Sequence, residues 1–324
     1  MEHLRHTSLA LFLSSLLISC SEAIIIPDSA TYNGTTSINA AEGSADLSVS
    51  ALKDETVLLE GDINNPRATV NPVDNSSFTT AQAFTVDAEV CGDIVARGDT
   101  ISAVLTLDAS GSMEDNDPDE LRAEAAKGFI DRMDSADQVA ITSFDTETEP
   151  TSPYQAIRLW QDFTNDKDLA RTAIDNATFF SGGTNLWDAG IDSFELLGTI
   201  QGENEVVVLL TDGEDTDSSS SVQDLIDSAT QSGIAVYTIG LGNDINADAL
   251  SRIATETRGT FNEVAEAVDL TGLFNRVFNA SQAAGCITLT FDPVPQVDVE
   301  GKLTFEVNRA TLSVSYRIPF SQQQ

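Results

Sequence analysis

Between about residues 99 and 280, apolar residues recur with two different periods. Uninterrupted apolar runs, typical of strands buried on both faces of a parallel sheet, alternate with stretches of helical period. The predicted strands are 101–107, 138–144, 157–163, 206–210 and 234–240, and the predicted helices are 117–133, 166–177, 186–197, 222–232, 246–257 and 267–280. This alternation predicts an α/β fold with a doubly wound, mostly parallel sheet, in which 157–163 is an edge hairpin strand.

Strand-like alternation of apolar and polar residues flanks this central region on both sides. It occurs once before the region and three times after it, at 84–90, 287–291, 303–307 and 312–318. We therefore expect 76–98 and 281–324 to form a small flanking antiparallel β region, a single sheet packed beside the α/β domain of residues 99–280. Residues 20–75 are rich in Ser, Thr, Asn and Ala with few aromatic residues, which predicts a flexible tether.

Oxygen-bearing side chains follow two of the most apolar predicted strands. Asp108, Ser110 and Ser112 come directly after strand 101–107, and Asp212 comes shortly after 206–210. Ligands bind at the carboxyl ends of strands in open α/β sheets, and such oxygens suit a small divalent cation. A Ser- and Gly-rich stretch after a strand is also typical of an ordinary loop, so the first motif alone leaves both interpretations open. The acidic run that follows it, from Glu114 to Glu120, is interpreted as a solvated loop whose carboxylates favour the start of the next helix.

Three motifs in a fixed order strengthen the metal interpretation. They are Asp-x-Ser-x-Ser at 108–112, Ser-Gly-Gly-Thr-Asn at 181–185 and Thr-Asp-Gly at 211–213. This order resembles the metal-ion-dependent adhesion site of the von Willebrand factor type A (VWA) family, which includes the ligand-binding inserted domain of integrins. The resemblance covers about residues 99–280 and implies that five residues hold the metal: Asp108, Ser110, Ser112, Thr184 and Asp212.

The resemblance also implies a protein partner that presents an Asp or Glu carboxylate to the metal. Mg²⁺ is the expected ion, because it suits six oxygen ligands and tolerates retained waters. Mn²⁺ and Ca²⁺ are the alternatives.

The N-terminus has the features of a secretion signal over residues 1–19. Arg5 precedes an apolar core at 9–18, which is too short to span a bilayer as a helix. The stretch that ends at Cys20 resembles the bacterial lipoprotein cleavage box, which implies acylation of Cys20 and a membrane anchor. Ser21 favours the outer membrane by the same family rule. The alternative is an ordinary signal peptide in which Cys20 has no special role.

Three cysteines leave two for each other if Cys20 carries lipid. Cys91 and Cys286 lie just outside the two ends of the VWA-like segment, where neighbouring strands could bring them together. A disulfide between them is expected, and it is compatible with the oxidising periplasm. The alternative is two buried free thiols.

Charge and histidine content restrict the function further. The net charge of −36, from 16 basic and 52 acidic residues, excludes a nucleic-acid-binding protein. His3 and His6 belong to the predicted leader, so the mature chain lacks the residue needed for Ser-His-Asp and Cys-His catalysis. We therefore predict a metal-dependent adhesion or assembly lipoprotein of the cell envelope, without enzymatic activity or a small-molecule substrate. The alternatives are a metal-assisted hydrolase and a structural module whose metal only stabilises loops.

Overall fold

A computed structural model describes residues 24–71, 83–98, 100–200, 202 and 204–320. The predicted leader, residues 1–19, and Cys20 lie outside the described residues. Within the described part, no helix combines the length and the apolar character needed to cross a membrane. The elements in chain order are β1 (Ser29–Asn39), β2 (Ser44–Lys53), β3 (Thr56–Val57), β4 (Glu60–Gly61), β5 (Ile63–Val70), β6 (Thr85–Ala96), β7 (Ile101–Asp108), α1 (Met113–Asn116), α2 (Leu121–Arg132), β8 (Gln138–Phe144), β9 (Arg158–Thr164), α3 (Lys167–Ala177), α4 (Leu186–Leu197), β10 (Asn204–Thr211), α5 (Val222–Ser232), β11 (Ala235–Leu241), α6 (Ala247–Glu256), β12 (Phe261–Val264), η1 (Ala267–Asp269), α7 (Leu270–Gln282), β13 (Ala283–Asp292), β14 (Val299–Val307) and β15 (Ala310–Ile318).

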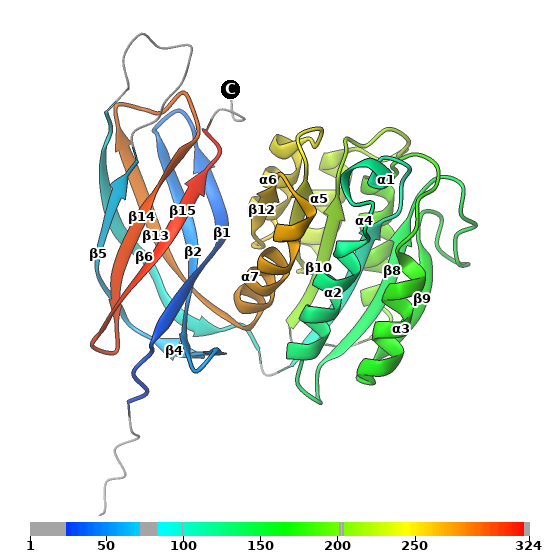
Figure 1. Cartoon of the computed structure of the whole chain (residues 1–324), viewed down its shortest axis with the longest axis horizontal. Coiled ribbons are helices and arrows are strands. Elements are labelled where there is room, and N and C mark those ends of the chain that lie inside the picture. The colour runs from blue at the N-terminus through cyan, green and yellow to red at the C-terminus, as the bar shows by residue number, and fades with distance from the viewer. Residues whose placement is uncertain (1–23, 72–82, 99, 201, 203, 321–324) are drawn as a thin grey trace, which may run out of the picture.

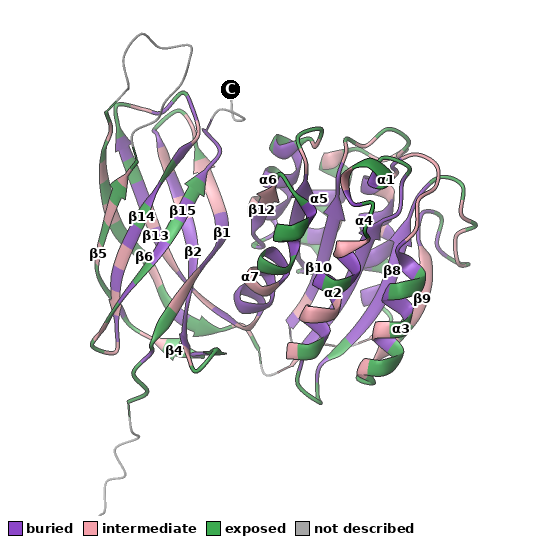
Figure 2. Ribbon diagram, in the orientation of Figure 1, coloured by how far each residue is buried: buried purple, intermediate pink, exposed green. Residues whose placement is uncertain are grey.

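The predicted doubly wound α/β region is confirmed. Its sheet has the order β12-β11-β10-β7-β8-β9, and neighbouring strands are parallel except for β8 and the edge strand β9. Helices α2, α3 and α7 pack on one face and α4, α5 and α6 on the other (Figure 1). Each face has its own hydrophobic core. Strand β7 contributes to both cores and is buried at every position, as Figure 2 shows for the central strands.

A β-sandwich lies beside the α/β region. Strands β4, β6, β13, β2 and β1 continue the main sheet, because β1 pairs with β12 where Thr35 lies opposite Phe261. The result is one sheet of 12 strands within the described residues. A second sheet of order β15-β14-β5 packs over the strands of this extension and encloses a separate core. The four predicted flanking strands exist as β6, β13, β14 and β15, but the prediction that they form one sheet is wrong, since they are divided between two.

The prediction of a flexible tether at residues 20–75 is also wrong for most of its length. Residues 29–70 form strands β1 to β5, and Leu47 lies in the core between the two sheets. The polar residues of this segment are compatible with burial because they pair with one another. Asn33 Nδ2 donates to Ser50 Oγ (2.8 Å), and Ser50 Oγ donates to the Ala283 carbonyl (2.6 Å). The polar composition of this segment therefore led to the prediction of a tether, although its buried hydroxyl and amide groups form hydrogen bonds within strands.

Cys91 and Cys286 form a disulfide, as predicted. The bond joins the antiparallel neighbours β6 and β13, where Cys286 lies opposite Gly92 at a register shift. The two cysteines are 195 residues apart in sequence. The bond therefore ties together the chain segments that enter and leave the α/β region.

Candidate metal centre

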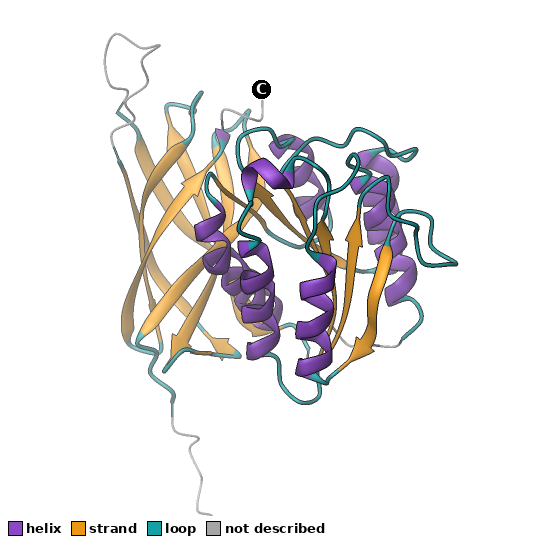
Figure 3. Cartoon of the chain, turned by 45° about the vertical axis from the view of Figure 1, so that its right-hand side comes forward, coloured by secondary structure: helices purple, strands orange, loops and turns teal. Residues whose placement is uncertain are grey.

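The carboxyl ends of β7 and β10 place the two predicted aspartates at the same edge of the sheet. The two strands are parallel neighbours in which Leu107 lies opposite Leu210. Asp108 ends β7, and Asp212 follows the last residue of β10. Figure 1 labels the short helix α1 at this edge, and the turned view of Figure 3 shows the loops gathered around it. The apolar strands thus end where these polar side chains can meet.

Hydrogen bonds join four of the five predicted ligands into one cluster. Asp108 Oδ1 accepts the backbone N–H of Ser110 (2.7 Å). The hydroxyl oxygens of Ser110 and Ser112 lie 3.1 Å apart, and Ser112 Oγ donates to Asp212 Oδ1 (2.7 Å). The structure therefore brings two carboxylates and two hydroxyls together, as the motifs predict.

The loop that leads to Thr184, the fifth predicted ligand, is held against the Asp108 loop through its backbone. The Ser181 N–H donates to the Ala109 carbonyl (2.8 Å), and the Gly111 N–H donates to the Gly182 carbonyl (3.0 Å). These bonds bring the Ser-Gly-Gly-Thr-Asn motif to the same edge as the other two motifs.

Thr184 is fixed from its other side by the loop after Asp212. It is buried, and its carbonyl accepts the N–H groups of Thr216 (2.8 Å) and Asp217 (3.1 Å). Gly182 permits this path because its φ is +61° and a Cβ there would lie 2.7 Å from Thr146 Oγ1. Gly182, two residues before Thr184, is therefore required by both the backbone conformation and the space available.

The electrostatics of the cluster favour a bound cation. Asp108 and Asp212 are both fully buried. Burial and the charge of Asp212 raise the pKa of Asp108 to about 6, against the hydrogen bonds from Ser110 and Thr211. Burial likewise raises the pKa of Asp212, against hydrogen bonds that include one from Asn116. Two buried carboxylates close to neutral hydroxyl oxygens form a donor set that fits a hard divalent ion.

Protons and metal ions are expected to compete for Asp108. Because the pKa of the metal-free carboxyl group is raised to about 6, the group is mostly ionised at pH 7 and mostly protonated at pH 5. Binding at the lower pH must displace a proton, so the Mg²⁺ affinity is expected to be about tenfold lower at pH 5 than at pH 7. Calorimetric titrations at the two pH values measure this ratio, and equal affinities would contradict it.

Sequence reasoning missed two side chains that orient the carboxylates. Thr211 Oγ1 donates to Asp108 Oδ2 (2.6 Å), and Asn116 Nδ2 donates to Asp212 Oδ2 (2.9 Å). Thr211 belongs to the Thr-Asp-Gly motif, so its position beside Asp212 is a signal for this role. Nothing in the sequence singles out Asn116.

The interpretation of the acidic run 114–120 as a solvated loop is wrong for Asp117. This residue is fully buried and forms an ion pair with Arg122 (2.7 Å). It also accepts the N–H of Leu121 (2.7 Å), so the predicted role of a carboxylate at the helix start is confirmed for α2. Arg122 Nη2 donates to the Phe179 carbonyl (2.8 Å), just before the Thr184 loop. Arg122 thereby links the loop before α2 to the loop that leads to Thr184. Both loops lie at the edge of the sheet that carries the predicted ligands, which we refer to as the metal edge.

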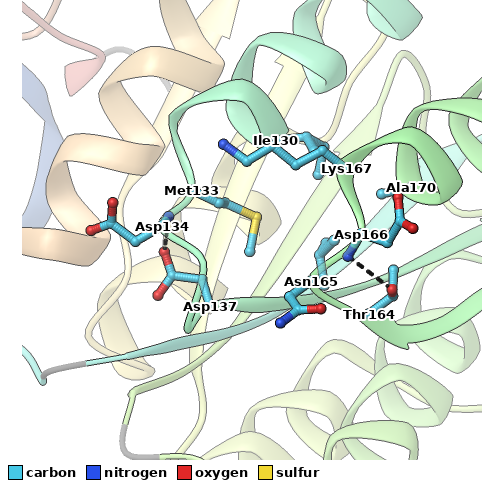
Figure 4. A pocket seen from close by; sticks show the side chains of 10 residues that line it. Ile130, Met133, Asp134, Asp137, Thr164, Asn165, Asp166, Lys167 and Ala170 are labelled. Atoms are coloured by element: carbon cyan, nitrogen blue, oxygen red, sulfur yellow. Dashed lines mark hydrogen bonds between the residues drawn. The ribbon is translucent and has the colours of Figure 1, made fainter.

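A small pocket at the opposite edge of the sheet is not a competing site. Figure 4 shows it near Met133, Asp137 and Lys167, between the end of α2 and the start of α3. Asp137 accepts the backbone N–H groups of Ile101 (2.8 Å) and Asp134 (2.7 Å), so it serves to hold the chain. The cavity volume of about 10 Å³ leaves room for a water molecule at most.

Comparison with known families decides the classification. The sequence model of the von Willebrand factor type A domain matches residues 104–276, which is more than half of the chain. The chain belongs to the von Willebrand factor type A family. The matched VWA segment contains all five predicted metal residues, and the resemblance inferred from the three motifs is confirmed.

Curated relatives match part of the chain at low identity. The uncharacterized protein sll0103 of Synechocystis sp. is 28% identical over 189 residues, which are 57% of this chain and 42% of that protein. Inter-alpha-trypsin inhibitor heavy chain H2 of Mus musculus is 24% identical over 193 residues, which are 54% of this chain and 19% of that protein. The match therefore spans less than half the length of these relatives.

Solved structures with a similar arrangement are distant. A von Willebrand factor type A protein from Catenulispora acidiphila has a TM-score of 0.46 at 14% identity, covering 90% of this chain and 73% of that one. Proximal thread matrix protein 1 from the mussel byssus, solved with a zinc-occupied MIDAS motif, has a TM-score of 0.48 at 21% identity. That similarity covers 62% of this chain and 49% of that one.

Proposed function

We propose that this VWA domain binds a protein partner through a divalent cation. The observation that carries the proposal is the hydrogen-bonded convergence of Asp108, Ser110, Ser112 and Asp212 at the carboxyl edge of the sheet. Thr184 completes the set from the adjacent loop, which is bonded to the first. Protein binding is a common role of VWA domains and supports this choice among the functions of a metal site.

The donor set suits a cation that keeps affinity for one more anionic oxygen. Only Asp108 and Asp212 carry charge, while the other three donors are neutral hydroxyls. A bound divalent ion would supply attraction for an Asp or Glu carboxylate of the partner, and Mg²⁺ suits the site best, with Mn²⁺ or Ca²⁺ as alternatives. Thr211 and Asn116 hold the two aspartates in place by hydrogen bonds before any partner arrives.

The cellular location proposed for this activity rests on the lipoprotein-like motif that ends at Cys20. Acylation of Cys20 would anchor the protein in the outer membrane, where the domain would serve adhesion or assembly of an envelope complex. Binding is favoured over catalysis because both histidines of the chain, His3 and His6, precede Cys20 and are removed with the leader.

A pull-down from envelope extract with Mg²⁺ or with EDTA tests the proposal. We expect a partner that is retained in Mg²⁺, released by EDTA and not captured by Asp108→Asn. The control Asp227→Asn, which neutralises an exposed carboxylate on α5, should capture it normally. Substitution of Asp and Glu residues in the captured partner should identify one carboxylate that is essential.

Two outcomes would contradict this function. Capture that survives EDTA would assign the metal a purely structural role. Turnover of a substrate that disappears in Asp108→Asn, without metal-dependent capture, would instead indicate a metal-assisted hydrolase.

A further inference from the structure

Most of the exposed large hydrophobic side chains in the described part of the chain lie at one end of the β-sandwich. Eight such side chains are exposed, and five belong to this group: Ile24 (57%), Ile25 (59%), Ile26 (52%), Leu59 (54%) and Val95 (60%). We refer to these five residues as the isoleucine patch. Clustered apolar surface of this kind is typical of a site that contacts a membrane or a partner.

Contacts between three chain segments hold the patch together. The Ile25 carbonyl accepts from Asn308 Nδ2 (2.9 Å), which lies in the turn between β14 and β15. A Cβ on Gly61 would lie 3.9 Å from the same Asn308 Nδ2, so β4 lies beside this turn. The ladder between β4 and β6 then places Val95 next to the strand that Leu59 precedes. The five residues, distant in sequence, therefore lie at the same end of the β-sandwich.

The isoleucine patch and the metal edge lie at opposite ends of the molecule. In Figure 1 the dark-blue segment that enters β1 leaves the sandwich at the bottom, while α1 lies at the top. Figure 3, turned about the vertical axis, keeps the same separation. A surface that contacts the patch therefore leaves the metal edge directed away from it.

We propose that the isoleucine patch lies in the interfacial layer of a bilayer with zwitterionic headgroups. The geometry rests on the lipid anchor of the proposed function. Four chain steps separate Cys20 from Ile24, and they span at most about 14 Å of extended chain. An acylated Cys20 thus keeps Ile24 within reach of the bilayer surface. Transfer of isoleucine side chains from water into this surface is favourable.

The charge around the patch determines which lipid surface it can approach. Asp28, Glu60 and Asp62 are exposed carboxylates at this end, and the whole chain carries a net charge of −36. Anionic headgroups repel such a surface within a Debye length of about 8–10 Å. Zwitterionic lipids such as phosphatidylcholine and phosphatidylethanolamine do not exert this repulsion. Binding to them is therefore determined by burial of the apolar side chains.

Vesicle co-sedimentation of residues 21–324 in EDTA tests the patch without an acyl chain or a metal. All described helices and strands lie within this segment, so the fold is kept. The protein is expected to sediment with phosphatidylcholine–phosphatidylethanolamine vesicles. Replacing all three isoleucines with serine should lower the partition coefficient at least about tenfold. The isoleucines precede β1 and are exposed, so circular dichroism of the variant should be unchanged.

A matched control removes exposed apolar side chains elsewhere. Leu169→Ser combined with Val268→Ser, at positions 51% and 71% exposed on the α/β region, should leave vesicle binding unchanged. The proposal is overturned if the unaltered chain does not sediment, if the serine variant binds equally well, or if anionic phosphatidylglycerol vesicles bind more strongly. Self-association in ultracentrifugation that the serine variant abolishes would assign the patch to a second copy of the chain and would also overturn it. Neither assay requires Cys20 or the metal site, so failure of the patch is distinguishable from failure of the proposed function.

Discussion

Replacing Asp108 with alanine is expected to weaken Mg²⁺ binding by more than about 100-fold, beyond the ~10–100-fold loss typical of residues that only support a metal ligand. Asp108 is one of two charged donors in the cluster, and its carboxylate is the acceptor for both Ser110 and Thr211. Its loss removes half of the negative charge and releases the start of the loop that carries Ser110. Isothermal titration calorimetry of the EDTA-treated protein measures the effect.

Two controls separate charge from packing in this experiment. Asp108→Asn keeps the size and one acceptor oxygen but removes the charge, so it should lose binding nearly as fully as the alanine variant. Asp227→Ala removes an exposed carboxylate from α5 and should bind Mg²⁺ like the unaltered protein. Unchanged affinity in Asp108→Asn would show that the ion binds elsewhere on this acidic surface.

Arg122→Ala is expected to destabilise the fold by about 3–5 kcal/mol, because it leaves a buried carboxylate without its counter-ion. Both side chains of the Arg122–Asp117 pair are fully buried, at a distance of 2.7 Å. The same guanidinium donates to the Phe179 carbonyl, and it lies over the ring of Phe180. Urea denaturation followed by circular dichroism measures the loss.

An exposed ion pair of similar length provides the matched control for Arg122→Ala. Arg171 lies 2.8 Å from Asp131, but the two side chains are 37% and 59% exposed. Arg171→Ala should therefore cost less than about 1 kcal/mol, since water and salt screen the pair. Equal losses in the two variants would contradict the role assigned to burial of the Arg122–Asp117 pair.

The α/β region was predictable because its signals are local. Strand β7 is buried on both faces, so it is an uninterrupted apolar run. Helix α5 ends at Ser232 and is followed by Gly233, whose φ of +75° favours glycine. The signals of the three metal motifs are local as well, because each motif follows or precedes an apolar strand or helix. Four of the five predicted ligands are linked directly by hydrogen bonds, and the fifth is brought in by its loop.

The N-terminal strands and the hydrogen bond that supports Asp212 depend on contacts between residues far apart in sequence, which no local pattern predicts. The burial of Asn33 and Ser50 depends on hydrogen bonds, one of which reaches Ala283 across 233 residues. Asn116 contacts Asp212, 96 positions further along the chain. A polar side chain in sequence looks the same whether it faces water or a buried partner, so the N-terminal strands and the support for Asp212 were missed for one reason.

Crystals of the protein soaked in Mn²⁺ and measured at the manganese absorption edge would show whether a divalent cation binds among the five predicted ligands. We expect one anomalous peak bounded by oxygen atoms of Asp108, Ser110, Ser112, Thr184 and Asp212, and none in crystals of Asp108→Asn. A fully occupied peak elsewhere, with no peak among these five side chains, would contradict it.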